Sequence, residues 1–220
     1  MSRISKEDNA NLCNPLISLL KEMRNNGVGE VVDARIREIK KMCKMPSREI
    51  FKELCFCILT ANFSAERSLK IQQEIDDGFL DLTRLKLAEK LRALGYRFPN
   101  TRACYIDEAR RHLDSLKNLI ESCKEEREMR EWLVNNVKGF GYKEASHFLR
   151  NIGFKDLAII DFHIIELLAR YGLVKKTKSL SKSRYLEIEK MLSRIAEKTN
   201  LSLAELDLHL WYIETGKILK

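Results

Sequence analysis

Apolar residues recur at intervals of three and four through almost the whole 220-residue chain. This spacing places them along one side of an α-helix. No segment shows the alternation of apolar and polar residues that marks a half-buried strand. The pattern predicts an all-α fold of ten or eleven helices. The expected helices cover residues 14–26, 31–44, 48–61, 64–78, 82–95, 100–123, 125–137, 142–153, 162–172, 183–200 and 202–220.

Basic residues outnumber acidic ones, 40 to 32, which gives a net charge of +8 and a pI of about 9.2. Such an excess favours a polyanionic partner, of which nucleic acid is the commonest. Ribosome-associated, membrane-surface and heparin-binding proteins are also basic, so charge alone leaves these classes open. No apolar run approaches the ~18 residues of a membrane span, and no leader is visible, so we expect a cytoplasmic protein without membrane contact.

Two glycines one residue apart, Gly139 and Gly141, interrupt the helical pattern between residues 137 and 142. Glycine can adopt positive φ and lets the backbone approach a ligand closely. The free amide groups at the start of the following helix would suit a phosphate. A hairpin of this kind can hold a nucleic-acid backbone without reading its sequence. An ordinary helix–helix turn with a glycine cap is the alternative.

Two oppositely charged residues follow the glycines. Lys143 falls in the first turn of the next helix, where a cation opposes the helix dipole. It is either one more surface lysine or a residue with a specific function. Asp161 stands between an apolar run and a further helix, where capping is the ordinary role of an aspartate. A capping carboxylate also points outward from a fixed position, which leaves a catalytic role open.

The set of Gly139, Gly141, Lys143 and Asp161 resembles the helix–hairpin–helix/Asp superfamily of DNA base-excision glycosylases. In that superfamily the hairpin contacts the DNA backbone, which implies this role for both glycines and for Lys138. The lysine marks the branch that also has AP lyase activity. The resemblance therefore implies that Lys143 and Asp161 are catalytic. Lys138 stands where the family usually has proline.

The resemblance also implies a two-lobed helical fold with a DNA-binding cleft between the lobes. The expected lobes are residues 30–125, and residues 1–29 together with 126–220. The iron–sulfur branch of the superfamily needs four closely spaced cysteines near the C-terminus. This chain has no cysteine after Cys123, so that branch is disfavoured.

The segments DLHLWYIETGKILK and GYRFPNTRA resemble the archaeal type of 8-oxoguanine DNA glycosylase/AP lyase. In that family an aspartate, a tryptophan and a terminal lysine help to build the base pocket, which implies this role for Asp207, Trp211 and Lys220. Plain structural roles remain open: a core tryptophan, a solvated aspartate and a frayed end. His163 is expected to be a core or capping residue rather than a catalyst.

Extrusion of a damaged nucleotide leaves a space in the duplex. The family resemblance assigns Asn62, in the turn TANFSAE, to that space or to the orphaned cytosine. A plain helix-capping asparagine is the alternative. Phe98 and Asn100, in RFPN, are a second candidate, near the base pocket or the strand break. We expect Phe98 to take part in base recognition and Asn100 in DNA binding.

The resemblance implies a monomer that acts on duplex DNA containing 8-oxoguanine, with no cofactor and no metal bound by side chains. A cation on backbone carbonyls near Asn135, Val137 and Phe140 is a further family feature. Three alternatives stay open: a glycosylase of the same fold for another damaged base, a non-catalytic hairpin protein that binds DNA, and a helical RNA-binding protein.

Overall fold

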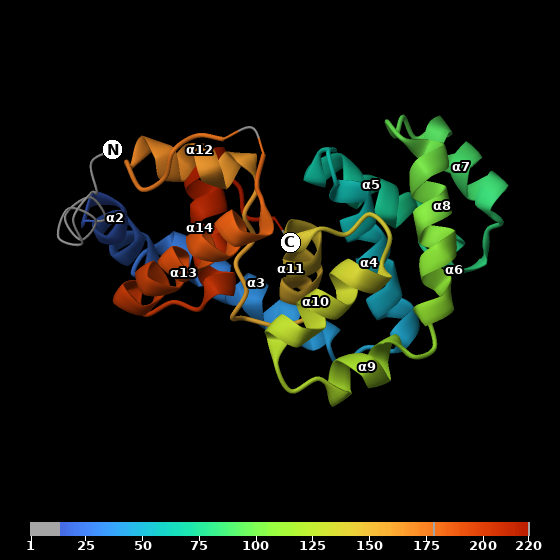
Figure 1. Cartoon of the computed structure of the whole chain (residues 1–220), viewed down its shortest axis with the longest axis horizontal. Coiled ribbons are helices and arrows are strands. Elements are labelled where there is room, and N and C mark those ends of the chain that lie inside the picture. The colour runs from blue at the N-terminus through green and yellow to red at the C-terminus, as the bar shows by residue number, and fades with distance from the viewer. Residues whose placement is uncertain (1–13, 178, 220) are drawn as a thin grey trace. The chain divides into compact units, whose positions relative to one another are not determined.

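The structure is a computed structural model that describes residues 14–177 and 179–219. These residues form thirteen α-helices and one short 3-10 helix, and no strand occurs among them (Figure 1). The prediction of an all-α fold is therefore confirmed. Within the described residues, none of the helices combines the length and the apolar character that a membrane crossing requires. Contacts between residues divide the chain into two compact units.

Unit 1 contains the described residues of 1–38 together with 155–218. Helix α14 packs on α12 and α13, and α13 packs on α2. The guanidinium of Arg24 donates to the carbonyl of Thr199 at 2.9 Å, which joins the ends of α2 and α13. The helices of unit 1 are α2 (Asn14–Arg24), most of α3 (Gly27–Met42), α12 (Phe162–Arg170), α13 (Lys182–Thr199) and α14 (Leu203–Thr215).

Unit 2 contains residues 39–154 and Leu219. It begins in the last turn of α3. Its further helices are α4 (Ser47–Thr60), α5 (Ala65–Ile75), α6 (Gly78–Asp81), α7 (Arg84–Ala93), α8 (Pro99–Ala109), η1 (Arg110–His112), α9 (Leu116–Ser122), α10 (Glu126–Asn136) and α11 (Tyr142–Asn151).

Helix α4 is the centre of unit 2. Every residue from Ile50 to Thr60 is buried, and the helix contacts α5, α6, α8, α9 and α11. A helix that is buried on all sides is expected to be apolar on all sides, and the run from Leu54 to Leu59 fits this rule. The two buried charges before it are paired: Lys52 lies 2.7 Å from Asp76, and Glu53 accepts from Asn151 at 2.6 Å. The C-terminus of α4 is therefore a fixed point from which the next turn starts.

The predicted helix at 100–123 is wrong as one element. The structure divides this stretch into α8, η1 and α9. The break falls where Ser115 bonds back to the carbonyl of His112 through both its backbone N–H, at 3.2 Å, and its hydroxyl, at 3.3 Å. Such local hydrogen bonds of serine compete with the helical pattern.

The units have different borders from the predicted lobes. The prediction separated residues 126–154 from residues 30–125. In the structure residues 126–154 belong to unit 2, because α11 packs on α4 and α10 packs on α11. Residues 30–38 belong to unit 1.

Candidate active site

The glycine hairpin connects α10 to α11 in unit 2. Gly139 has φ +89°, and a Cβ atom there would lie only 2.5 Å from the ring of Tyr105. Both the backbone conformation and the lack of space therefore require glycine at this position. Gly141 has φ −103°, an extended conformation open to other residues, and it forms the N-cap of α11. Only Gly139 uses the positive φ that both glycines permit.

Side chains from both helices hold the hairpin together. The hydroxyl of Tyr142 donates to the carboxylate of Glu131. The guanidinium of Arg130 lies 4.8 Å from the centre of the Tyr142 ring and donates to the hydroxyl of Ser146 at 3.3 Å. Arg130 is only 1% exposed. These contacts fix the start of α11, and with it the backbone of Lys143.

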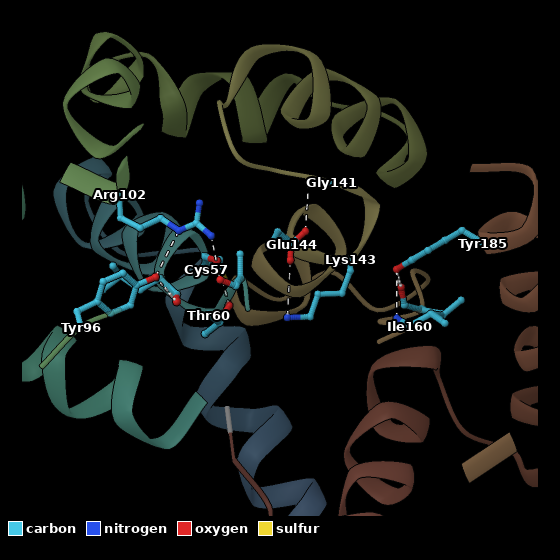
Figure 2. Close-up of polar contacts among 12 residues, drawn as sticks. Cys57, Thr60, Tyr96, Arg102, Gly141, Lys143, Glu144, Ile160 and Tyr185 are labelled. Atoms are coloured by element: carbon cyan, nitrogen blue, oxygen red, sulfur yellow. Dashed lines mark hydrogen bonds and ion pairs between the residues drawn. The ribbon is translucent and has the colours of Figure 1, made fainter. Parts of the chain in front are cut away.

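Lys143 lies in the first turn of α11 with its side chain 23% exposed. Its amine nitrogen is 3.9 Å from Oε1 of Glu144, and Oε2 of Glu144 accepts from the N–H of Gly141 at 3.2 Å (Figure 2). Sequence reasoning missed Glu144. A signal was present, since a glutamate three residues after the N-cap is typical of a helix start.

Lys138 forms an ion pair in unit 2. Its amine lies 2.9 Å from Oε1 of Glu108 and 5.6 Å from the centre of the Tyr105 ring. The hydrogen bond that Lys138 donates to the carboxylate of Glu108 raises the pKa of Lys138 above its ordinary value. The side chain is otherwise exposed, so a phosphate would compete with Glu108 for this amine.

The backbone cation site at Asn135, Val137 and Phe140 stays a prediction. The carbonyl of Val137 accepts from the N–H of Phe140 at 3.1 Å, which closes the turn of the hairpin. A carbonyl oxygen has a second lone pair, so this bond does not occupy it fully. Within residues 14–177 and 179–219, no three His, Cys, Asp or Glu side chains are grouped so that they could hold a metal ion.

The other predicted DNA-binding and base-recognition residues of unit 2 lie in the turn after α4 and at the start of α8. Asn62 is exposed and has φ +59°, a conformation that asparagine tolerates better than most residues. The centre of the Phe98 ring lies 4.9 Å from the guanidinium carbon of Arg97 and 5.9 Å from that of Arg102. Asn100 is exposed and accepts from Arg92 at 2.9 Å.

Asp161 belongs to unit 1 and is the N-cap of α12. Its Oδ1 accepts from the N–H of Ile164 at 2.9 Å, so the capping role is confirmed. Its Oδ2 has no hydrogen-bond partner among the described residues. The hydroxyl of Tyr185 accepts from the N–H of Ile160 at 3.3 Å and donates to the carbonyl of Ala158 at 2.6 Å (Figure 2). These bonds fix the segment that leads into Asp161.

Two of the predicted base-recognition residues lie one turn apart on α14, in unit 1. Asp207 is 9% exposed, so the reading as a solvated residue is wrong. Trp211 is half-buried, and its ring meets the ring of His163 edge-on, with the centres 5.6 Å apart. His163 is exposed, so the expected core position is wrong, and Asp161 supplies the cap instead. Lys220 lies outside the described residues.

A family model described as 8-oxoguanine DNA glycosylase matches residues 32–201. The chain belongs to the 8-oxoguanine DNA glycosylase family. The match covers the hairpin, Lys143 and Asp161, and it ends before α14. The family relationship therefore supports the resemblance that the hairpin residues indicated, while the roles of the individual side chains stay predictions.

Curated relatives and solved structures match over nearly the whole chain. The 8-oxoguanine DNA glycosylase/AP lyase of Korarchaeum cryptofilum is 52% identical over 206 residues, which cover 93% of this chain and 98% of the relative. The 8-oxoguanine DNA glycosylase/AP lyase of Methanocaldococcus jannaschii is also 52% identical, over 93% of this chain and 99% of the relative. The crystal structure of the M. jannaschii 8-oxoguanine DNA glycosylase matches with a TM-score of 0.91 and 50% identity, covering 96% and 99%. The structure of the same organism's enzyme in complex with 15mer DNA containing 8-oxoguanine matches with a TM-score of 0.91 and 51% identity, covering 93% and 99%.

Proposed function

We propose that the protein is a bifunctional DNA glycosylase/AP lyase that excises 8-oxoguanine from duplex DNA in base excision repair. The observation that carries the proposal is the position of Lys143, in the first turn of α11 directly after the Gly139 hairpin. The names of the curated relatives and the DNA complex of the M. jannaschii enzyme support it. Because these relatives come from prokaryotes, where the chromosome lies in the cytoplasm, we assign the protein to that compartment.

Catalysis begins when the damaged nucleotide leaves the base stack, which costs a few kcal/mol. The backbone amides of the hairpin and the amine of Lys138 hold the neighbouring phosphates. Asn62, exposed and with its side chain free of hydrogen bonds within the described chain, takes the vacated space or contacts the orphaned cytosine.

Lys143 then acts as the nucleophile. An ammonium has no lone pair, so the amine must lose a proton before it attacks C1′ of the sugar. A bond from Nζ to C1′ forms while the C1′–N9 bond breaks, and the departing base takes the electron pair and a proton. The sugar ring opens to give a Schiff base. Loss of a proton from C2′ then breaks the C3′–O3′ bond, which is the lyase step.

Asp161 has an electrostatic and a proton-transfer role in the proposal. Its Oδ1 is held by the N–H of Ile164, so Oδ2 is the oxygen that faces a ligand. A fixed carboxylate stabilises the positive charge that develops on the sugar, and it can accept the amine proton. Asp207, Trp211 and Lys220 recognise the base. The 8-oxoguanine N7 carries a hydrogen that guanine lacks, so recognition needs an acceptor there.

Borohydride trapping tests the proposal directly. The wild-type protein and Lys143→Gln are incubated with a duplex that holds one 8-oxoguanine opposite cytosine. We expect a covalent protein–DNA adduct with the wild type and none with the variant. Duplexes with an oxidised pyrimidine or an alkylated purine test the alternative substrates. An adduct with Lys143→Gln would refute the assignment of the nucleophile, and the absence of any wild-type adduct would favour a non-catalytic DNA-binding protein.

A further inference from the structure

The C-terminus of α4 has an unusual cap. The last carbonyl groups of a helix have no partner within the helix and are often satisfied by a glycine turn. In α4 the helix instead ends at an extended Ala61, followed by Asn62 at φ +59°. Two of the carbonyls are satisfied by side chains from residues far along the chain, those of Tyr96 and Arg102.

Arg102 is the centre of this cap. Its Nη2 donates to the carbonyl of Ala61 at 2.9 Å, directly before Asn62. Its Nε donates to the hydroxyl of Tyr96 at 3.3 Å, and that hydroxyl donates to the carbonyl of Leu59 at 2.8 Å (Figure 2). One planar guanidinium thus fixes both the end of α4 and the start of the turn that carries Asn62.

The burial of Arg102 lowers the stability of the fold, so stability alone does not explain an arginine at this position. The residue is 8% exposed, and no carboxylate of the described chain lies within salt-bridge distance of it. A buried charge without a counter-charge loses hydration that carbonyl groups restore only in part. The C-terminal dipole of α4 offsets some of this cost. An apolar side chain would fill the same volume at lower cost, but it would leave the carbonyl of Ala61 and the hydroxyl of Tyr96 without the bonds that Arg102 donates.

The same guanidinium also connects the turn to the other predicted DNA-contacting segments of unit 2. Its carbon atom lies 5.9 Å from the centre of the Phe98 ring and 5.4 Å from that of Tyr105. The Tyr105 ring in turn leaves no room for a side chain at Gly139 of the hairpin. The hydrogen bonds that Arg102 donates go to Ala61 and Tyr96, so the turn 61–63 is the segment that it holds directly.

We infer that Arg102 is a positioning residue for base extrusion: it holds the turn 61–63 so that Asn62 enters the duplex in a fixed orientation. The inference rests on the proposed function and extends it to a residue that does not touch the DNA. A displacement of about 1 Å in a positioned group can lower a rate by 10²-fold. Loss of Arg102 should therefore slow excision without removing any group that contacts substrate.

A double-mutant cycle under single-turnover conditions tests this inference. Excision from the 8-oxoguanine:cytosine duplex is measured for the wild type, Asn62→Ala, Arg102→Met and the double variant. We expect Arg102→Met to lower the excision rate roughly 10- to 100-fold. Because Arg102 acts through Asn62, we expect the double variant to match Asn62→Ala within about twofold. Arg102→Lys, which can still donate to the carbonyl of Ala61, should lie between the wild type and Arg102→Met.

Arg110→Met is the matched control. Arg110 also donates from its guanidinium to a backbone carbonyl of unit 2, that of Phe79 at 2.8 Å, but it holds no segment that we assign to DNA. Its loss should lower the melting temperature and leave the excision rate of the folded protein unchanged. All rates are measured below the melting temperature of the weakest variant, with Arg102→Lys replacing Arg102→Met in the cycle if the latter does not fold.

Three results would overturn the inference: effects of Asn62→Ala and Arg102→Met that multiply in the double variant, an Arg102 variant as fast as the wild type, or an equal loss of rate in Arg110→Met. A wild-type protein that excises no base from this duplex would instead refute the proposed function. The two failures are therefore distinguishable.

Discussion

Asn62 and Asp161 both lie at the end of a helix, but they are held there by different means. The turn of Asn62 in unit 2 is fixed by Tyr96 and Arg102, which bond to residues 37 and 41 positions away. Asp161 in unit 1 is fixed by its own bond to the N–H of Ile164, three positions away. The position of Asp161 depends on a bond to a neighbour in the sequence. The position of Asn62 depends on the side chains of residues that are distant in the sequence and come close only in the folded unit.

The largest effect should follow from Asp161→Asn. Asparagine caps a helix about as well as aspartate, so the fold and the position of the side chain are retained. The charge is lost, and with it the proton acceptor, so we expect the single-turnover excision rate to fall about 10²- to 10⁴-fold. The melting temperature should stay close to that of the wild type.

Asp161→Ala is the companion variant, because it removes both the charge and the cap. We expect it to lose the same activity and, in addition, about 1 kcal/mol of the free energy of unfolding. Full activity in Asp161→Asn would mean that Asp161 is only a cap. A large loss of stability in Asp161→Asn would mean that the position of this residue depends on more than its bond to the N–H of Ile164.

Gly139→Ala should have the next largest effect, on the free energy of unfolding and on DNA binding together. Alanine at φ +89° is strained, which costs roughly 1–3 kcal/mol, and its Cβ would displace the ring of Tyr105. Denaturant unfolding and binding to an undamaged duplex measure the two losses.

Gly141→Ala is the matched control, since its backbone is extended and its Cβ would meet only the carboxylate of Glu144 at 3.3 Å. We expect much smaller losses in the free energy of unfolding and in DNA binding for this variant. Equal losses for the two alanine variants would show that the hairpin does not depend on the distant contact with Tyr105.

The difference between contacts with sequence neighbours and contacts with distant residues also explains which features of the fold the sequence could predict. Asp161 was predicted as a cap because the determinants of a helix start lie within a few residues. Ser64, Thr83 and Asp161 each accept from the backbone N–H three positions on. The glycine hairpin and Lys143 were readable as a local pattern. The break of the helix at 110–115 was not readable, because the apolar spacing continues on both sides of it and Leu116 and Ile120 are buried like the residues of α8.

The residues that hold the Asn62 turn were also beyond sequence reasoning. Arg102 stands in an ordinary amphipathic helix, where an arginine is expected on the solvated side. Its burial depends on the carbonyls at the end of α4, which come close only in the folded unit. The ring contact of His163 with Trp211 of another helix was likewise beyond sequence reasoning.

A smaller effect concerns the stability of unit 1 at acidic pH. His209 is 1% exposed, its Nδ1 donates to the carbonyl of Glu205 at 2.8 Å, and its Nε2 has no partner among the described residues. Burial lowers the pKa of His209, opposed by the bond to Glu205 and the charge of Asp33, while Arg24 lowers it further.

The sign of the effect follows from this lowered pKa. Above the ordinary pKa the imidazole is neutral in both the folded and unfolded states. Below it the unfolded state binds the proton more readily, so the free energy of unfolding should fall as the pH drops from 7.5 to 5.5. We expect the melting temperature of the wild type to fall by a few °C more than that of His209→Gln over this range. Equal falls in melting temperature for the two proteins would mean that the bond to the carbonyl of Glu205, rather than burial, determines the protonation state of His209.

The smallest effect tests whether the exposed ion pair of the hairpin faces DNA. If Lys138 exchanges Glu108 for a phosphate, Lys138→Met should weaken binding to all duplexes alike and reduce the slope of log K against log salt by about 1. Glu108→Gln should have the opposite effect on affinity, because it frees the amine without removing its charge. Filter binding or fluorescence anisotropy on an undamaged duplex at several salt concentrations measures both. An unchanged slope in Lys138→Met would show that this lysine stays with Glu108 and that the hairpin binds phosphate through its backbone amides alone, which would leave Lys143 as the hairpin lysine with a role in the reaction.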